Sequence, residues 1–115
     1  MAALAAITPV VAGVASAGAA VAASDTIDTS ILGGRGAYLE IINGNASSDS
    51  MTITDYGSTP AGNALTSNTY AVTVTNGTSK IIFLKPSMVN PSTGLITVTH
   101  SVTTTVTYKL YPVSI

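Results

Sequence analysis

The sequence predicts an all-β protein, a small antiparallel β-sandwich or barrel of jelly-roll-like form, with an extended N-terminal arm. From residue 37 onwards, short runs of β-branched and aromatic residues alternate with clusters of Gly, Pro, Asn and Ser, which is the pattern of a sandwich or barrel. No part of this region requires a helix. The chain has 115 residues, enough for one domain with a modest core.

Turn residues divide the β-prone runs into three consecutive pairs, and we expect each pair to form a hairpin. Asn43-Gly44 and Asn76-Gly77 supply the positive φ angles of tight turns. Residues 56–68 and 85–94 are rich in Gly, Pro and Asn and are expected to be loops. The paired runs are residues 37–42 with 51–54, 70–75 with 80–84, and 95–99 with 102–111.

Alternation in the last run predicts which of its side chains face the core. One set is mainly apolar and is expected inside: Val102, Thr104, Val106, Tyr108 and Leu110. The other set is expected to face solvent: Thr103, Thr105, Thr107, Lys109 and Tyr111. Because the chain has no Trp and one Phe, we expect a core built from Ile, Val, Leu and Tyr.

Residues 1–24 are apolar, Ala-rich and free of charge. A secretion signal would carry a basic start, but the first basic residue is Arg35. A membrane or soluble helix would be interrupted by Pro9, Gly13 and Gly18. The signal and the membrane helix remain alternatives. We favour an arm that leaves the domain and lies on another subunit, where burial of apolar area offsets its ordering.

The sequence therefore divides into an arm over residues 1–24, a Gly-rich hinge over residues 25–36 and a β domain over residues 37–115. The hinge contains Ile31-Leu32-Gly33-Gly34-Arg35-Gly36, which lacks the Lys-Ser/Thr ending of a phosphate-binding loop. The arm is expected to make its assembly contacts through its larger apolar residues. These are Leu4, Ile7, Pro9, Val10, Val11 and Val14.

The charge content indicates an assembly subunit. Only 8% of residues are charged, against roughly 25% in an ordinary soluble domain. A surface of Thr, Ser and Asn solvates a protein without repelling a partner. Four scattered basic residues and a net charge of -1 argue against nucleic-acid binding. The absence of Cys excludes disulfides, Cys-based zinc sites and thiol catalysis.

The titratable residues predict no active site, metal site or cofactor. His100 is the single histidine and is expected to be exposed or on an edge strand rather than a general base. Asp25, Asp28 and Asp49 are expected to cap turns or aid solubility. Glu40 is expected in a cross-strand pair with Arg35 or a Lys. We therefore expect a protein that is not an enzyme.

Two stretches resemble the small head proteins of tailed bacteriophages, of the capsid decoration or cement type. The first is Ser24-Asp25-Thr26 followed by Gly34-Arg35-x-x-x-Leu39-x-Ile41-x-Asn43-Gly44. The second begins at Pro86 and continues through Val89-Asn90 and Gly94-Leu95-Ile96-Thr97-Val98-Thr99-His100-Ser101 into a Thr/Val-rich final strand. The order and spacing of these motifs carry the resemblance, because each is weak alone.

The resemblance implies a β-sandwich on the exterior of a virion capsid, bound to the major capsid protein and to itself as a homotrimer, without membrane contact. The arm would dock on capsid protein or on neighbouring subunits. Two alternatives remain open. One is another virion component, such as a minor coat, neck or tail protein. The other is a secreted bacterial adhesin or carbohydrate-binding module, for which five Tyr and no Trp are a poor aromatic supply.

Overall fold

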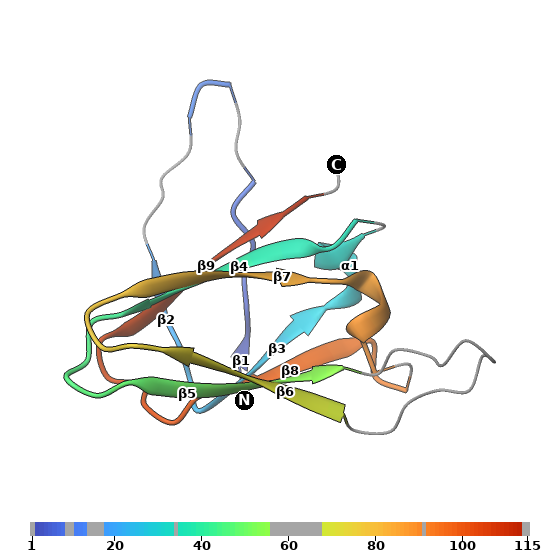
Figure 1. Cartoon of the computed structure of the whole chain (residues 1–115). Coiled ribbons are helices and arrows are strands. Elements are labelled where there is room, and N and C mark those ends of the chain that lie inside the picture. Colours follow the sequence, from blue (N-terminus) through green and yellow to red (C-terminus); the bar gives the residue numbers. More distant parts are fainter. Residues whose placement is uncertain are drawn as a thin grey trace.

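The computed structural model is a sandwich of two β-sheets (Figure 1), which confirms the predicted all-β class. It describes residues 2–8, 11–13, 18–33, 35–55, 68–90 and 92–113. The elements in chain order are β1 (Ala2–Ala3), β2 (Ala19–Ala20), β3 (Ser24–Asp28), α1 (Thr29–Leu32), β4 (Ala37–Asn43), β5 (Asp49–Asp55), β6 (Asn68–Val74), β7 (Ser79–Leu84), η1 (Pro86–Met88), β8 (Leu95–Thr99) and β9 (Val106–Pro112).

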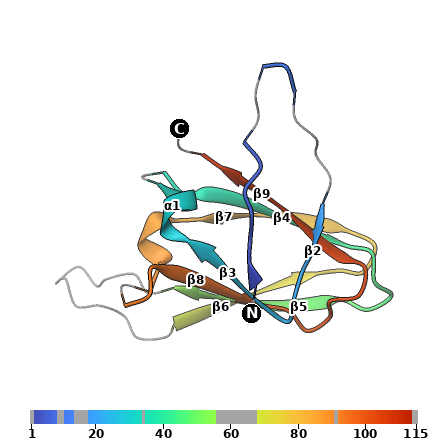
Figure 2. The same ribbon diagram turned by 180° about the vertical axis from the view of Figure 1, so that it is seen from behind.

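The strands are divided between two sheets. Sheet A has the order β1-β3-β8-β5-β6, and sheet B has the order β2-β9-β4-β7. Neighbouring strands are antiparallel, except that β1 runs parallel to β3. The short strands β1 and β2 lie at one side of the sandwich. Figure 2 shows the N-terminal segment crossing this side from sheet A to sheet B.

The three predicted hairpins are wrong, because the two strands of each pair lie in different sheets. β4 and β5, β6 and β7, and β8 and β9 are each divided between sheet B and sheet A. The Asn76-Gly77 turn itself is present, with Gly77 at φ 77° and the Thr78 amide donating to the Thr75 carbonyl. A turn sequence specifies a reversal of direction. Whether the next strand pairs beside the previous one or packs opposite it depends on distant strands.

Alternation correctly predicted the inward-facing residues within β9. Val106, Tyr108 and Leu110 of β9 are buried, and Val102 packs against the core. Thr104 instead lies exposed in the turn before β9, because the strand begins four residues later than predicted. The core is built from Ile, Leu, Val and Tyr, as expected, together with Met51 and Met88.

The expected hinge over residues 25–36 is part of the folded domain. Residues Ser24–Asp28 pair with β8 over their whole length, and Leu32 of α1 is buried. Gly36 is fixed by packing: it has φ 88°, and a Cβ there would lie 2.1 Å from the Leu84 carbonyl oxygen. Glycine is therefore present because two backbones approach closely, rather than to provide flexibility.

Candidate functional site

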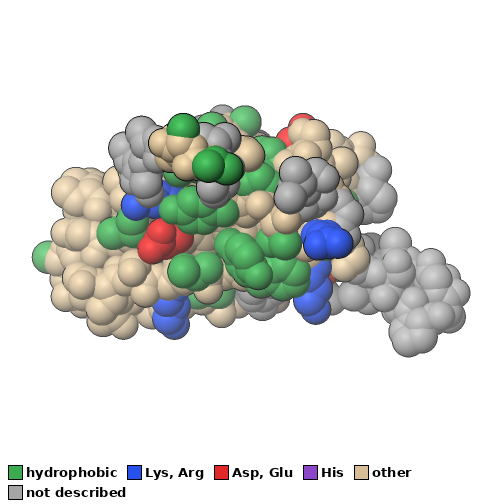
Figure 3. All heavy atoms as spheres, turned by 90° about the horizontal axis from the view of Figure 1, so that it is seen from above, with side chains coloured by type: hydrophobic (Ala, Val, Ile, Leu, Met, Phe, Trp, Pro, Cys, Tyr) green, Lys and Arg blue, Asp and Glu red, His purple; other side chains and the backbone are tan. Residues whose placement is uncertain are grey.

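The outer face of sheet B presents an apolar patch. Tyr38, Ile81 and Phe83 are 45%, 67% and 46% exposed. Tyr38 and Phe83 are cross-strand partners on β4 and β7, with ring centroids 5.7 Å apart and planes inclined by 48°. Figure 3 shows hydrophobic side chains gathered on this face. We call Tyr38, Ile81 and Phe83 the β4–β7 patch.

The register extends this patch into a row of three rings. Tyr38 faces Phe83 on one side and Tyr111 of β9 on the other. The adjacent row carries charge, because Glu40 lies between Lys109 and Ile81. The cross-strand neighbour of Glu40 on β9 is therefore a Lys, one of the two kinds of partner expected for it.

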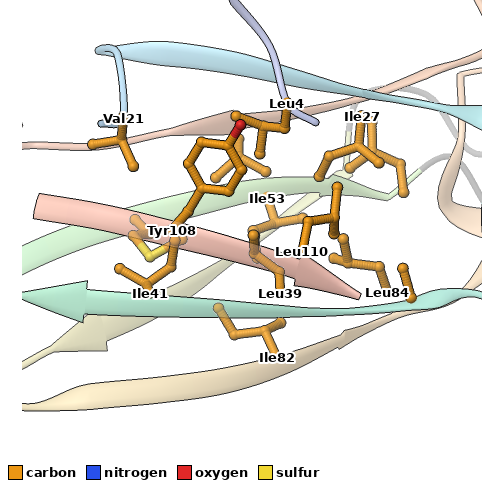
Figure 4. Close-up of a cluster of buried hydrophobic side chains, with 14 of the residues drawn as sticks. Leu4, Val21, Ile27, Leu39, Ile41, Ile53, Ile82, Leu84, Tyr108 and Leu110 are labelled. Atoms are coloured by element: carbon orange, nitrogen blue, oxygen red, sulfur yellow. The ribbon is translucent and has the colours of Figure 1, made fainter. Parts of the chain in front are cut away.

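The ends of the predicted arm belong to the sandwich. Leu4 is 5% exposed, Val21 is 8% exposed, and both join the core. Figure 4 shows them beside Tyr108, whose hydroxyl oxygen accepts a hydrogen bond from the Ala5 amide at 2.9 Å. The Ile7 amide donates to the Leu110 carbonyl at 2.6 Å. The expectation that residues 1–24 leave the domain is thus wrong for both ends, because their apolar side chains fill the open side of the sandwich.

Between these ends, residues 11–13 stand away from the sandwich (Figures 1 and 2). Residues 11–13 and 18–20 are exposed, and the Val11 side chain is fully so. We call the described residues 11–13 the projection. Of the six predicted contact residues, Leu4 is in the core, Ile7 is half-buried beside β9 and Val11 is on the projection. Pro9, Val10 and Val14 lie outside the described residues.

A buried polar cluster joins three distant parts of the chain. Asp25 and Asp49 are fully buried and His100 is 9% exposed. His100 Nδ1 lies 2.6 Å from Asp49 Oδ2, and His100 Nε2 lies 3.9 Å from Asp25 Oδ2. This placement corrects the expectation of an exposed His100 and of solvated Asp25 and Asp49. Asp28 does cap a turn: its side chain accepts from the Ser30 amide at the start of α1.

The cluster holds the base of the N-terminal segment. Asp25 Oδ2 accepts from the Ala22 amide at 3.1 Å, and the His100 amide donates to the Ala23 carbonyl at 3.0 Å. Asp49 Oδ1 accepts from the Ser101 amide at 3.0 Å. Asp25 therefore fixes the backbone just before its own strand, whereas Asp49 and His100 each bond to backbone of a distant segment. Together the three residues join β3, β5 and the connection after β8.

The geometry of this cluster does not suit a single metal ion. The two ring nitrogens of His100 face two different carboxylates, so one ion could not be bound by all three side chains without rearrangement. Within the described ranges, no three His, Cys, Asp or Glu side chains are grouped to hold a metal ion. Asp25 Oδ1 is buried and accepts no hydrogen bond from the described residues.

Sequence reasoning missed this cluster, although alternation contained a signal for it. His100 has the same parity as the buried Ile96 and Val98, and Asp49 the same parity as the buried Met51 and Ile53. Side chains two residues apart point to the same face of a strand. A polar residue that continues an inward series is therefore a candidate for a buried, paired position.

No protein-family model, curated protein or solved structure matches the chain in comparisons with known proteins. Among the described residues, no helix has the length and apolar character needed to cross a membrane.

Proposed function

We propose that this protein is a non-enzymatic structural component of a tailed-phage virion. It decorates and stabilises the capsid from outside, as a homotrimer, by binding the major capsid protein. The observation that carries the proposal is the projection: it is apolar and uncharged, it is exposed at Val11, and the chain before and after it is fixed in the sandwich at Ile7 and Val21. The resemblance in the sequence supplies the capsid as the partner.

Fixed ends suit the projection to docking. A free arm loses conformational entropy when it binds. Here Leu4 and Val21 are already packed in the core, and the Ile7 amide is bonded to β9. Fixation on both sides leaves the projection less conformational freedom to lose, which lowers the cost of binding.

The low charge of the surface supports the same role. A decoration protein covers a shell in many copies that lie close together. With a net charge of -1, neighbouring copies repel one another little. Repetition over the shell then adds the avidity that a small contact lacks.

Binding to shells assembled from the major capsid protein tests the proposal. Purified protein is mixed with shells and sedimented, and the bound fraction is measured against protein concentration. We expect saturable binding that Val11→Lys weakens about tenfold, because the new ammonium group would either be buried at a cost or hold the tip away from the capsid protein or neighbouring subunit on which it docks. Thr73→Lys is the matched control, since Thr73 is exposed on sheet A and should bind like the unmodified protein.

The unmodified protein failing to sediment with shells would overturn the proposal. Equal binding by Val11→Lys and the control would show that the projection takes no part in binding to the shell. Deletion of residues 1–23, the obvious truncation for a free arm, is unsuitable because it would also remove Leu4 and Val21 from the core.

A further inference from the structure

The exposed large hydrophobic side chains of the described residues fall in two places. Val11 is at the tip of the projection, and the other three form the β4–β7 patch. Isolated exposed apolar residues are ordinary on protein surfaces, but a contiguous apolar group indicates a contact surface. The protein therefore has one apolar protrusion and one apolar patch, and the two have matching chemistry.

The protrusion and the patch lie toward opposite edges of sheet B. The described residues on either side of the projection are bound to β9, through the Ile7 amide and through β2. The patch is on β4 and β7, and β7 is the far edge of the order β2-β9-β4-β7. Figure 1 shows the projection standing away from β7, and full exposure of Val11 shows that the tip does not cover its own patch.

We propose that copies of this protein associate head to tail, with the projection of one copy seated on the β4–β7 patch of the next. This inference names the contact between subunits of the proposed decoration protein. It rests on the proposed function, which brings many copies together on one shell. A contact between two different surfaces of identical chains repeats from copy to copy and can close into a ring. A homotrimer is one such ring.

The chemistry of the two surfaces fits this occupant. Residues 1–24 contain no charged side chain, so the tip can be buried on Tyr38, Ile81 and Phe83 without desolvating an ion. The outer edge of β7 also bonds to no other described strand. It can therefore add backbone hydrogen bonds to an extended segment, as β9 does to Ala19 and Ala20.

The size of the patch predicts a weak contact. A half-exposed ring leaves on the order of 100 Å² to be covered, so the three side chains offer about 300 Å². A standard interface buries about 800 Å² on each partner. Association in solution is therefore expected at about 10–500 µM protein. On a shell the local concentration is higher, so nearly all copies would be associated.

Sedimentation of the isolated protein over that range tests the contact. Val11→Lys alters the projection, and Ile81→Lys alters the patch while placing the new Lys opposite Glu40, its neighbour in register. Thr73→Lys again serves as the control, and thermal unfolding establishes that each variant is folded. We expect the unmodified protein and the control to self-associate, and both other variants to bind about tenfold more weakly.

Mixing the two weakened variants tests the head-to-tail arrangement. Val11→Lys retains an intact patch, and Ile81→Lys retains an intact projection. The mixture should form one-to-one pairs at concentrations where each variant alone is a monomer of 11.5 kDa. A contact between two patches, or between two projections, would give no such rescue and would overturn the inference.

A monomeric unmodified protein across the whole range would also overturn it. That result is separate from shell binding: protein that decorates shells but stays monomeric in solution contradicts this inference alone. Protein that associates head to tail but does not bind shells contradicts the proposed function alone.

Discussion

His100 Nδ1 lies 2.6 Å from Asp49 Oδ2, inside a protein that has few charged residues. The contact joins the start of β5 to the residue that follows β8, and Asp49 also accepts from the Ser101 amide. Because Asp25 and His100 in turn bond to Ala22 and Ala23, this pair helps to fix the base from which the N-terminal segment leaves.

Asp49→Ala is expected to destabilise the protein by about 3 kcal/mol, since it removes the partner of the buried His100 ring and the acceptor of the partly buried Ser101 amide. Urea denaturation followed by circular dichroism measures the loss. Asp28→Ala, which removes the exposed carboxylate that caps α1, is the matched control and should cost much less. Similar losses in the two variants would mean that the buried contact contributes no more than a surface cap.

Leu4→Ala and Val11→Ala should separate the two parts of the N-terminal segment. Leu4 is packed in the core and Val11 is fully exposed. We expect a loss of about 2–4 kcal/mol for Leu4→Ala, from reduced burial and the cavity left behind, and almost none for Val11→Ala. Thermal and urea unfolding report both values. A negligible effect of Leu4→Ala would mean that the segment does not pack in the core and is a free arm.

Gly36→Ala should be far more damaging than Gly94→Ala. Both glycines have positive φ, 88° and 72°, so both variants incur about 1 kcal/mol of backbone strain. At Gly36 the new Cβ would also lie 2.1 Å from the Leu84 carbonyl oxygen, while at Gly94 it would meet nothing within 4 Å. We expect a total loss of about 3–4 kcal/mol for Gly36→Ala, measured by denaturant unfolding. Equal losses would show that steric contact with β7 is unimportant.

Thr105→Gly is expected to stabilise the protein. Thr105 has φ 57° in the exposed turn before β9, and a β-branched residue is strained in that region. Relief of about 1–2 kcal/mol of strain exceeds the entropic cost of glycine, about 0.5–1 kcal/mol. The melting temperature should therefore rise by a few degrees. Thr104→Gly is the control, because Thr104 lies in the same turn without positive φ, and it should lower the melting temperature. A lower melting temperature in both variants would show that Thr105 is not strained.

The resemblance to phage decoration proteins stays a prediction, since it depends on the order of weak motifs in the sequence. What the structure adds is the distribution of apolar side chains on which the proposal is based. It divides the apolar segment into core residues such as Leu4 and a projection tipped by Val11, and it places a second apolar patch at Tyr38, Ile81 and Phe83.

The sequence by itself determined the all-β class and much of the inward-facing set, because side-chain direction along a strand depends on local geometry alone. Val106, Tyr108 and Leu110 are inside because a period of two allows no other arrangement once one of them is buried. The turn at Asn76-Gly77 was predictable for the same local reason.

Only the tertiary structure decided which strands became neighbours. β6 and β7 are separated by a turn that would suit a hairpin, yet β6 pairs with β5 and β7 pairs with β4. The competing arrangements place the same side chains inward, so they differ mainly in contacts between residues far apart in the chain. The cluster of Asp25, Asp49 and His100, and the entry of Leu4 into the core, come from those same distant contacts. For that reason the N-terminal segment proved to be both part of the sandwich and a projection from it.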